Sequence, residues 1–423
     1  MTFLYILIYI VFQLIHKFVF VVIEPKYLSS WLGVVEAGFL GLFVLTGVML
    51  SIKRQRKTND KQNEKIKLTE VLLIGAIIMV VLFSSALNKS KKVMEWDAVA
   101  LYDARAMFLK AGVKFSDMVQ FSKYDEVNYY YLMYPPFTSI SHYMWREVLP
   151  TVSVSLYYSV YLLLFAVGLY LLASKLLGRF YGLLAVLLTI LIKDIFILSI
   201  LEYANLPFTT NIVFAVLLLA IYLKYKEKWT LFMSAVLLAL SQWIRFLEPV
   251  WLLVITVFSV VLIKEKRYKE LIISVLILLT PSVLNYLSWN NFVSNIAHNP
   301  NSVTTNTSII INMIIGLVAG KAFEVFKYCI KVFGLQFVGY LATLISGLLF
   351  IKRKIMDSSF TYLLYFLTAT ILFYFIAIYY SSFQGEWWQS LGGSVIRSSS
   401  YIIPIAIIIN LGIIKQIMRG NAR

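Results

Sequence analysis

Apolar runs of about twenty residues recur along most of this 423-residue chain, and they constrain its fold more than any other feature. A helix needs about twenty such residues to cross the hydrocarbon core of a bilayer. Strands of a membrane barrel would be shorter and would alternate between apolar and polar residues. Because lipid offers no hydrogen bonds to the backbone, runs of this length are satisfied only as helices. We therefore expect an all-α polytopic membrane protein.

The basic links between these runs predict how the chain is oriented. About twelve spans are expected, near residues 2–22, 32–52, 69–87, 153–173, 180–200, 206–223, 230–244, 248–263, 271–288, 333–351, 359–380 and 396–417. Basic links at 53–68, 174–179, 224–229, 264–270 and 352–358 then share one side with the C-terminal tail. Cytoplasmic loops carry an excess of Lys and Arg. We predict a multi-pass cell-membrane protein with both termini cytoplasmic and its large polar loops extracytoplasmic.

The formal charge of +17 has the same origin, because the basic residues cluster in these links. No nucleic-acid partner is expected, whereas membrane lipids are. Cys329 is the single cysteine and cannot form an internal disulfide, and three scattered histidines show no metal-ligand spacing. Redox and zinc chemistry are therefore not expected. We assign no cofactor and no metal ligands, and the need for a divalent metal stays open.

One apolar segment is predicted not to span the membrane. Counting 309–332 as a span would place the basic residues near 352 outside, against the orientation rule. An interfacial amphipathic helix fits better, because charged residues interrupt the segment. We expect an additional N-terminal helix pair and basic link at 1–68, followed by a transmembrane unit at 69–423. That unit contains an outer loop at 88–150 and an interfacial segment at 289–332.

The outer loop at 88–150 is polar and rich in aromatic residues, and it carries the candidate catalytic carboxylates. The stretch from Glu95 to Gly112 is predicted to be helical, with Asp97 and Arg105 on one flank and Asp103 pointing elsewhere. A carboxylate beside a guanidinium group pairs a potential base with a potential phosphate ligand. Asp97 is the first candidate, and Asp103 and Glu95 are the others. The alternative is an exposed helix with solvated charges.

Two other outer turns could wall a pocket. Tyr134, Pro135 and Pro136 form a rigid extended corner, which could equally be a simple stop between loop and helix. Glu202 and Asn205 lie in the turn "EYANLP", where Asn205 could instead cap the following helix.

Arginines at two further outer turns could bind a phosphate group. Arg245 lies three residues before Glu248, and Arg397 shares a helix face with Tyr401. Guanidinium groups match phosphate oxygens well. Snorkelling or a structural salt bridge is the alternative. Inside the fifth expected span we expect an ion pair between Lys193 and Asp194, because ionisable groups there are costly unless paired.

Taken in order, the acidic outer loop, the Pro-Pro corner, the "YANLP" turn, the "IRFLEP" turn and the late "RSSSYIIP" helix give the chain a resemblance to a known class. It resembles the GT-C polyprenyl-phosphate-dependent glycosyltransferases, within them the group of protein mannosyltransferases and lipid A aminoarabinose transferases. The resemblance covers about residues 69–410 as a pattern of motifs. It implies inverting transfer of a sugar from a polyprenyl-phosphate donor to an acceptor hydroxyl on a glycan, lipid or protein, with Asp97 as base.

The sequence departs from that class at two acidic positions. Glu95-Trp96-Asp97 replaces the first-loop Asp-Glu pair of many members, and Asn205 stands where an acid is common, with Glu202 nearby. The candidate donor-phosphate residues are Arg397, Arg245 and Arg105, and the candidate pocket residues are Tyr134, Pro135, Pro136, Glu202, Asn205 and Tyr401. The alternatives are a transporter or lipid-linked glycan flippase, an O-antigen polymerase or ligase, and a noncatalytic scaffold.

Overall fold

In the computed structural model all regular secondary structure in the described part of the protein is helical, which confirms the all-α prediction. The described residues are 1–55, 66–91, 95, 98–118, 134–246, 248–296, 312–313, 315–317, 320–352 and 357–420. Asp97, the first candidate base, lies outside these ranges.

The helices that precede residue 200 are α1 (Thr2–Ile23), η1 (Pro25–Ser29), α2 (Trp31–Gln55), α3 (Leu68–Ser90), the π-helix η2 (Ala98–Asp103), α4 (Ala104–Lys110), α5 (Phe115–Met118), α7 (Phe137–Val148), α8 (Ser155–Leu177), α9 (Arg179–Leu191) and α10 (Lys193–Leu198). The later helices are α11 (Asn205–Tyr225), α12 (Lys228–Ile244), α13 (Val250–Lys264), α14 (Tyr268–Ile296), α16 (Lys321–Phe333), α17 (Leu335–Lys352), α18 (Ser358–Ser381), η4 (Glu386–Ser390), α19 (Gly392–Ser398) and α20 (Ile402–Gly420).

Within the described ranges, seven helices are long and apolar enough to cross a membrane: α1, α2, α3, α8, α11, α14 and α18. The number rises to nine if two bent pairs, α16 with α17 at 104° and α19 with α20 at 55°, each count as one span. Helices α9, α12 and α13 are apolar but shorter. The structure therefore supports a polytopic membrane protein, and the predicted number of twelve spans is not confirmed.

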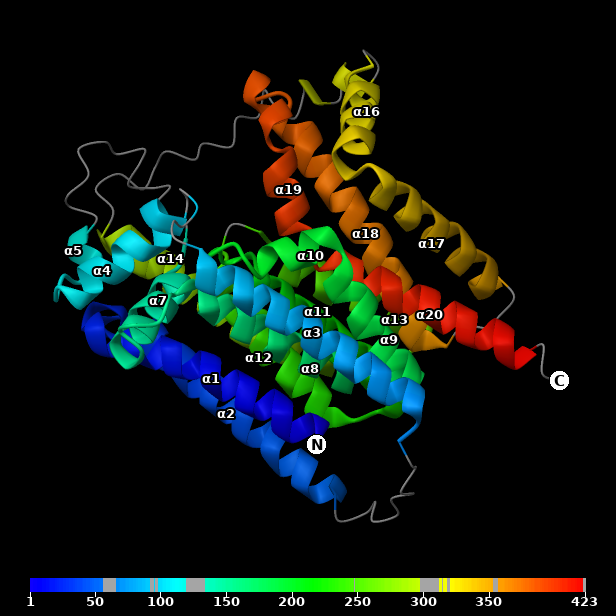
Figure 1. Ribbon diagram of the computed structural model, residues 1–423, viewed down its shortest axis with the longest axis horizontal. Helices are drawn as coiled ribbons and strands as arrows, with labels where there is room; N and C mark the ends of the chain where they lie inside the picture. The colour runs from blue at the N-terminus through cyan, green and yellow to red at the C-terminus, as the bar shows by residue number, and fades with distance from the viewer. Residues whose placement is uncertain are drawn as a thin grey trace.

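The central helix of the bundle is α11, which packs against α8, α12 and α18. It is largely apolar and buried on all sides, as expected of a helix surrounded by protein. Figure 1 shows α1 and α2 along one edge of the molecule and the C-terminal helices α16 to α20 along the opposite edge, with α8 to α13 between them. Helix α11 therefore runs through the core of the bundle.

Buried polar contacts join α1 and α2 to the rest of the bundle. The Tyr9 hydroxyl of α1 donates to Asn211 Oδ1 of α11 at 2.7 Å, and Asn211 Nδ2 donates to Gln13 Oε1 at 2.9 Å. On α2, the Glu36 carboxylate accepts from Lys17 and from the Tyr27 hydroxyl, and α2 packs against α12 and α14. The N-terminal pair that the sequence analysis treats as an addition is thus fastened by side chains inside the bundle.

Two local expectations can be compared with the structure. The Asp194 carboxylate at the start of α10 accepts a hydrogen bond from Gln336 of α17 in place of the expected pairing with Lys193. Adjacent residues on a helix do not face each other, which explains the difference. In the segment expected to be interfacial, α16 buries Val325 and Cys329 along one face and turns by 104° into α17. The remainder of that segment lies largely outside the described residues.

Candidate functional site

A polar cavity of about 90 Å³ lies where separate segments of the chain meet at the N-terminal end of α11. Its lining residues come from η2, the Pro-Pro corner, the turn before α11, the end of α12, and α19: Leu101, Tyr102, Tyr134, Tyr203, Asn205, Arg245, Ser394, Arg397 and Ser398. Four residues that the sequence singled out, Tyr134, Asn205, Arg245 and Arg397, meet here although they are far apart in the chain. We call this the arginine cavity.

Arg245 enters the cavity from the end of α12. Its backbone is extended (φ −143°, ψ 109°), which ends the helix at Ile244. Its Nη2 donates to Glu248 Oε1 at 2.6 Å, and its guanidinium group lies 5.6 Å from the Phe208 ring centroid. Burial disfavours the charged form, but the neighbouring Glu248 carboxylate outweighs this effect and holds the pKa of Arg245 above its usual value. Arg245 is therefore a fixed cation with one carboxylate partner.

Arg397 enters the cavity from α19, just before the chain bends by 55° into α20. Its guanidinium carbon lies 4.9 Å from the Tyr203 ring centroid, and Nη2 is 3.4 Å from Ser394 Oγ. Among the side chains that the structure describes, no carboxylate forms an ion pair with it. Together with Arg245, Asn205 and nearby hydroxyl groups, Arg397 offers an anion such as phosphate several charge-assisted hydrogen bonds.

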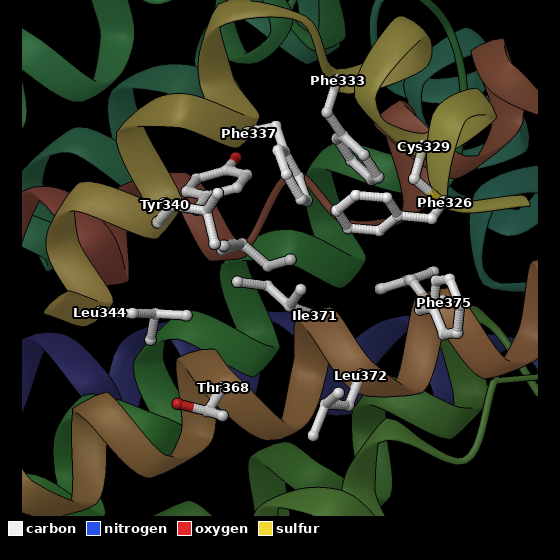
Figure 2. Close-up of a pocket in the computed structure, with 13 residues that line it drawn as sticks. Phe326, Cys329, Phe333, Phe337, Tyr340, Leu344, Thr368, Ile371, Leu372 and Phe375 are labelled. Atoms are coloured by element: carbon white, nitrogen blue, oxygen red, sulfur yellow. The ribbon is translucent and has the colours of Figure 1, made fainter. Parts of the chain in front are cut away.

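A second, apolar cavity of about 310 Å³ lies between α16, α17 and α18. Figure 2 shows the aromatic rings of Phe326, Phe333 and Phe337 directed into it, opposite Ile371 and Leu372 of α18. Thr368, Tyr340 and Tyr374 are the lining residues with a hydroxyl group, and Ile402 of α20 completes the wall. Such a lining suits a hydrocarbon chain and offers little to a polar ligand. We call this the aromatic cavity.

A short chain of side chains connects the two cavities. Tyr374 lines the aromatic cavity, and its hydroxyl donates to Glu248 Oε2 at 3.4 Å. The other oxygen of Glu248 binds Arg245, which lines the arginine cavity. Tyr401, a predicted pocket residue, is fully buried beside this bridge, with its ring centroid 6.4 Å from Tyr374 and 6.1 Å from Phe208. The aromatic cavity and the arginine cavity are thus separated by only a few side chains.

Asp103, a predicted catalytic carboxylate, joins η2 to α7. Arg146 Nη2 lies 2.8 Å from each carboxylate oxygen, and His142 Nδ1 lies 3.5 Å from Oδ1. Burial alone would raise the pKa of Asp103, but the hydrogen bonds from His142 and Arg146 prevail and lower it. Burial lowers the pKa of His142, whose Nε2 is 2.9 Å from the Tyr158 hydroxyl. Asp103 is therefore held ionised between two partners.

The other predicted residues occupy different places. Glu95 is exposed, and Pro135 and Pro136 are buried where the chain enters α7. Arg105 is buried, with Nη1 donating to the Tyr134 carbonyl oxygen at 2.8 Å. Glu202 is buried and accepts from Lys91 at 2.8 Å and from Ser155 Oγ at 2.6 Å.

Asn205 does not cap α11. The N-cap residue is Ala204, which has no side-chain cap, and Asn205 is the first helical residue and lines the arginine cavity. Its amide is therefore available to the cavity.

Sequence reasoning did not single out Ser394 and Ser398 as cavity residues. Both lie on α19, where Ser394 is three residues before Arg397 and four before Ser398, the spacings at which helix residues are neighbours. Their hydroxyl groups lie close in sequence to Arg397, a candidate phosphate ligand, and this proximity could have predicted their place in the cavity. The aromatic cavity could not be predicted in this way, because its lining residues form the same pattern as any other apolar helix face.

In the described ranges, no three His, Cys, Asp or Glu side chains gather where they could hold a metal ion. No protein-family model matches the chain, and neither a curated protein nor a solved structure was found to be similar to it. The geometry of the two cavities therefore carries the functional argument.

Proposed function

We propose that this protein is a membrane-embedded glycosyltransferase that moves a sugar from a polyprenyl-phosphate-linked donor to an acceptor hydroxyl. The observation that carries the proposal is the adjacency of the arginine cavity to the aromatic cavity, bridged by Tyr374 and Glu248. A lipid-phosphate donor has one anionic group joined to a long apolar chain. The arginine cavity matches the first part and the aromatic cavity the second.

In the proposed reaction, a carboxylate base accepts the proton of the acceptor hydroxyl while its oxygen attacks the anomeric carbon. The bond between that carbon and the lipid-phosphate oxygen breaks, and the phosphate leaves with the electron pair. The negative charge on the phosphate increases by one as it leaves. Guanidinium groups therefore bind it more tightly in the transition state than in the donor. Attack opposite the leaving group inverts the anomeric centre.

Asp97 is the proposed base. It immediately precedes Ala98, and η2, which Ala98 begins, contributes Leu101 and Tyr102 to the arginine cavity. Asp103 is less suited to the role, because Arg146 and His142 hold its carboxylate. We assign Asp103 to positioning η2 against α7. Arg397 is the proposed main phosphate ligand, since Glu248 already compensates Arg245.

The test is lipid binding by the purified full-length chain, measured by native mass spectrometry with undecaprenyl phosphate and undecaprenyl-phosphate hexose as probes. We expect both probes to bind, and Arg397→Gln to weaken them about tenfold or more, because one charge-assisted contact contributes about 1.5–3 kcal/mol. Arg179→Gln is the matched control, since Arg179 contacts Glu70 and does not line the cavity. Equal affinity of wild type and Arg397→Gln would contradict the assignment.

Binding alone does not separate an enzyme from a lipid-glycan transporter. The second measurement is therefore product formation by proteoliposomes that contain the hexose donor and candidate acceptors. Release of undecaprenyl phosphate with transfer of the hexose is the expected result. Movement of intact donor across the bilayer without such release would replace the proposal with a flippase.

A further inference from the structure

A third cavity lies at the opposite end of α11 and α12 from the arginine cavity. It has a volume of about 670 Å³ and is open to the surface. Tyr222 and Lys226 at the C-terminal end of α11 line it, whereas Asn205 at the N-terminal end lines the arginine cavity. The 21 residues of α11 rise about 30 Å, roughly the thickness of the hydrocarbon core. The two cavities are therefore separated by about one bilayer.

Three lysines stand at this cavity: Lys226, Lys228 and Lys269. All three are exposed. One acid, Glu270, also lines the cavity, but Arg267 binds it with Nε 2.8 Å from Oε2, so most of its charge is compensated outside the cavity. Lys226 is 3.9 Å from the other oxygen of Glu270. The lining therefore has an excess of positive charge.

The backbone at Lys226 is left-handed, as it also is at Lys266 outside the cavity. Lys226 ends α11 in the left-handed conformation, with φ 54° and ψ 34°. Glycine adopts that conformation without steric cost, whereas a residue with a side chain does so uncommonly. This turn ends α11 at the cavity, and because Lys266 adopts the same conformation elsewhere, the turn by itself does not indicate a ligand.

Most of the other walls of the cavity are apolar, beside the hydroxyl groups of Thr46 and Ser274. Leu50 of α2, Leu231 and Phe232 of α12, and Ile273 and Ile277 of α14 form them. These helices are membrane-spanning candidates or neighbours of them. Ammonium groups above an apolar groove match a molecule with an anionic head and a hydrocarbon chain.

We propose that this cavity binds an anionic phospholipid of the membrane, with its phosphate at Lys226, Lys228 and Lys269 and an acyl chain between α2 and α14. The site is distinct from the arginine cavity and does not depend on the glycosyltransferase proposal. The occupant is a bilayer lipid, because the apolar walls would leave a soluble phosphate ion in contact with hydrocarbon side chains.

The experiment is native mass spectrometry of the full-length chain titrated with phosphatidylglycerol or with phosphatidylcholine of the same acyl chains. We expect phosphatidylglycerol to bind preferentially. In Lys226→Gln/Lys269→Gln its affinity should fall about tenfold to thirtyfold, since each lysine near an anionic lipid contributes roughly a fivefold effect. Lys264→Gln/Lys266→Gln removes the same charge at the same end of the bundle but outside the cavity, and should change affinity by less than about threefold.

A second pair of variants tests the acyl chain and keeps the proposal falsifiable if the lysine variant does not fold. Ile273→Trp fills the groove, whereas Leu276→Trp adds the same bulk on α14 outside it; the two side chains are 59% and 61% exposed. Only Ile273→Trp should release phosphatidylglycerol. Equal binding of the two lipids, equal losses in matched variants, or displacement of the lipid by millimolar inorganic phosphate would each overturn the proposal.

Discussion

Two groups of charges in this protein differ in how they are compensated. Between α1 and α2, Lys17 contacts both Glu36 and Asn285, and the second oxygen of Glu36 accepts from the Tyr27 hydroxyl at 2.6 Å. In the arginine cavity, Arg397 has an aromatic ring and a serine hydroxyl nearby but no carboxylate from the described ranges. The charges of Lys17 and Glu36 are compensated by each other, whereas the charge of Arg397 faces a cavity.

This difference separates stability from binding. Removing one partner of a closed buried pair leaves an uncompensated charge, which destabilises the fold strongly. Removing a cation that faces a cavity leaves no such charge and affects the ligand instead. Substitution of a compensated charge is therefore expected to lower stability, and substitution of a cavity-facing charge is expected to weaken ligand binding.

Asp97→Asn should reduce sugar transfer about a hundredfold to ten-thousandfold, because a positioned base contributes that much to rate. Binding of the undecaprenyl-phosphate hexose and the melting temperature should stay close to wild type. Single-turnover product formation in proteoliposomes measures the first quantity. Glu147→Gln, an exposed carboxylate on α7 that does not line the arginine cavity, is the control. Transfer by Asp97→Asn within a few-fold of wild type would reject Asp97 as the base.

Glu36→Gln should lower the free energy of unfolding by about 3–5 kcal/mol, because the Lys17 ammonium group would lose its carboxylate partner inside the bundle. Lys17→Met/Glu36→Met, which removes both charges, should lose clearly less. Thermal unfolding in detergent, followed by tryptophan fluorescence, compares the two variants. If the double variant were less stable than Glu36→Gln, the pair could not be described as a compensated structural charge.

Arg397→Gln and Arg245→Gln should differ although both residues line the arginine cavity. Arg397→Gln should keep its melting temperature, whereas Arg245→Gln leaves Glu248 without its guanidinium partner and should lose about 1–3 kcal/mol. Arg245→Gln/Glu248→Gln should recover part of that loss. Equal stability of the two single variants would show that compensation does not distinguish these arginines.

Much of the fold was predictable because span length and basic links act locally along the chain. Arg245, Arg397, Asn205 and Tyr134 were expected at one end of the bundle, and the structure brings them together in the arginine cavity. The fate of Glu202 was not predictable, because its partners Lys91 and Ser155 lie on other elements and their register depends on tertiary packing. The aromatic cavity was equally hidden, as helix faces become cavities only through their neighbours.

The smallest predicted effect concerns Asp103 and His142, which join η2 to α7. Burial lowers the pKa of His142 below 6.5, and hydrogen bonds from His142 and Arg146 overcome burial to lower the pKa of Asp103 below 3.8. In both cases the unfolded state binds the proton first, so stability rises with pH across each window. Melting temperature should therefore fall as pH decreases from about 6.5, through the His142 window, and fall further below about 4, through that of Asp103.

Two variants separate these windows. His142→Asn should flatten the upper part of the profile, because the neutral buried imidazole that must charge on acidification is gone. Asp103→Asn should flatten the lower part and lower stability at neutral pH, since Arg146 loses its carboxylate partner. A wild-type melting temperature that rose on acidification would contradict both assignments. Such a rise would require groups whose pKa values are higher in the folded than in the unfolded state, the opposite of the directions given for Asp103 and His142.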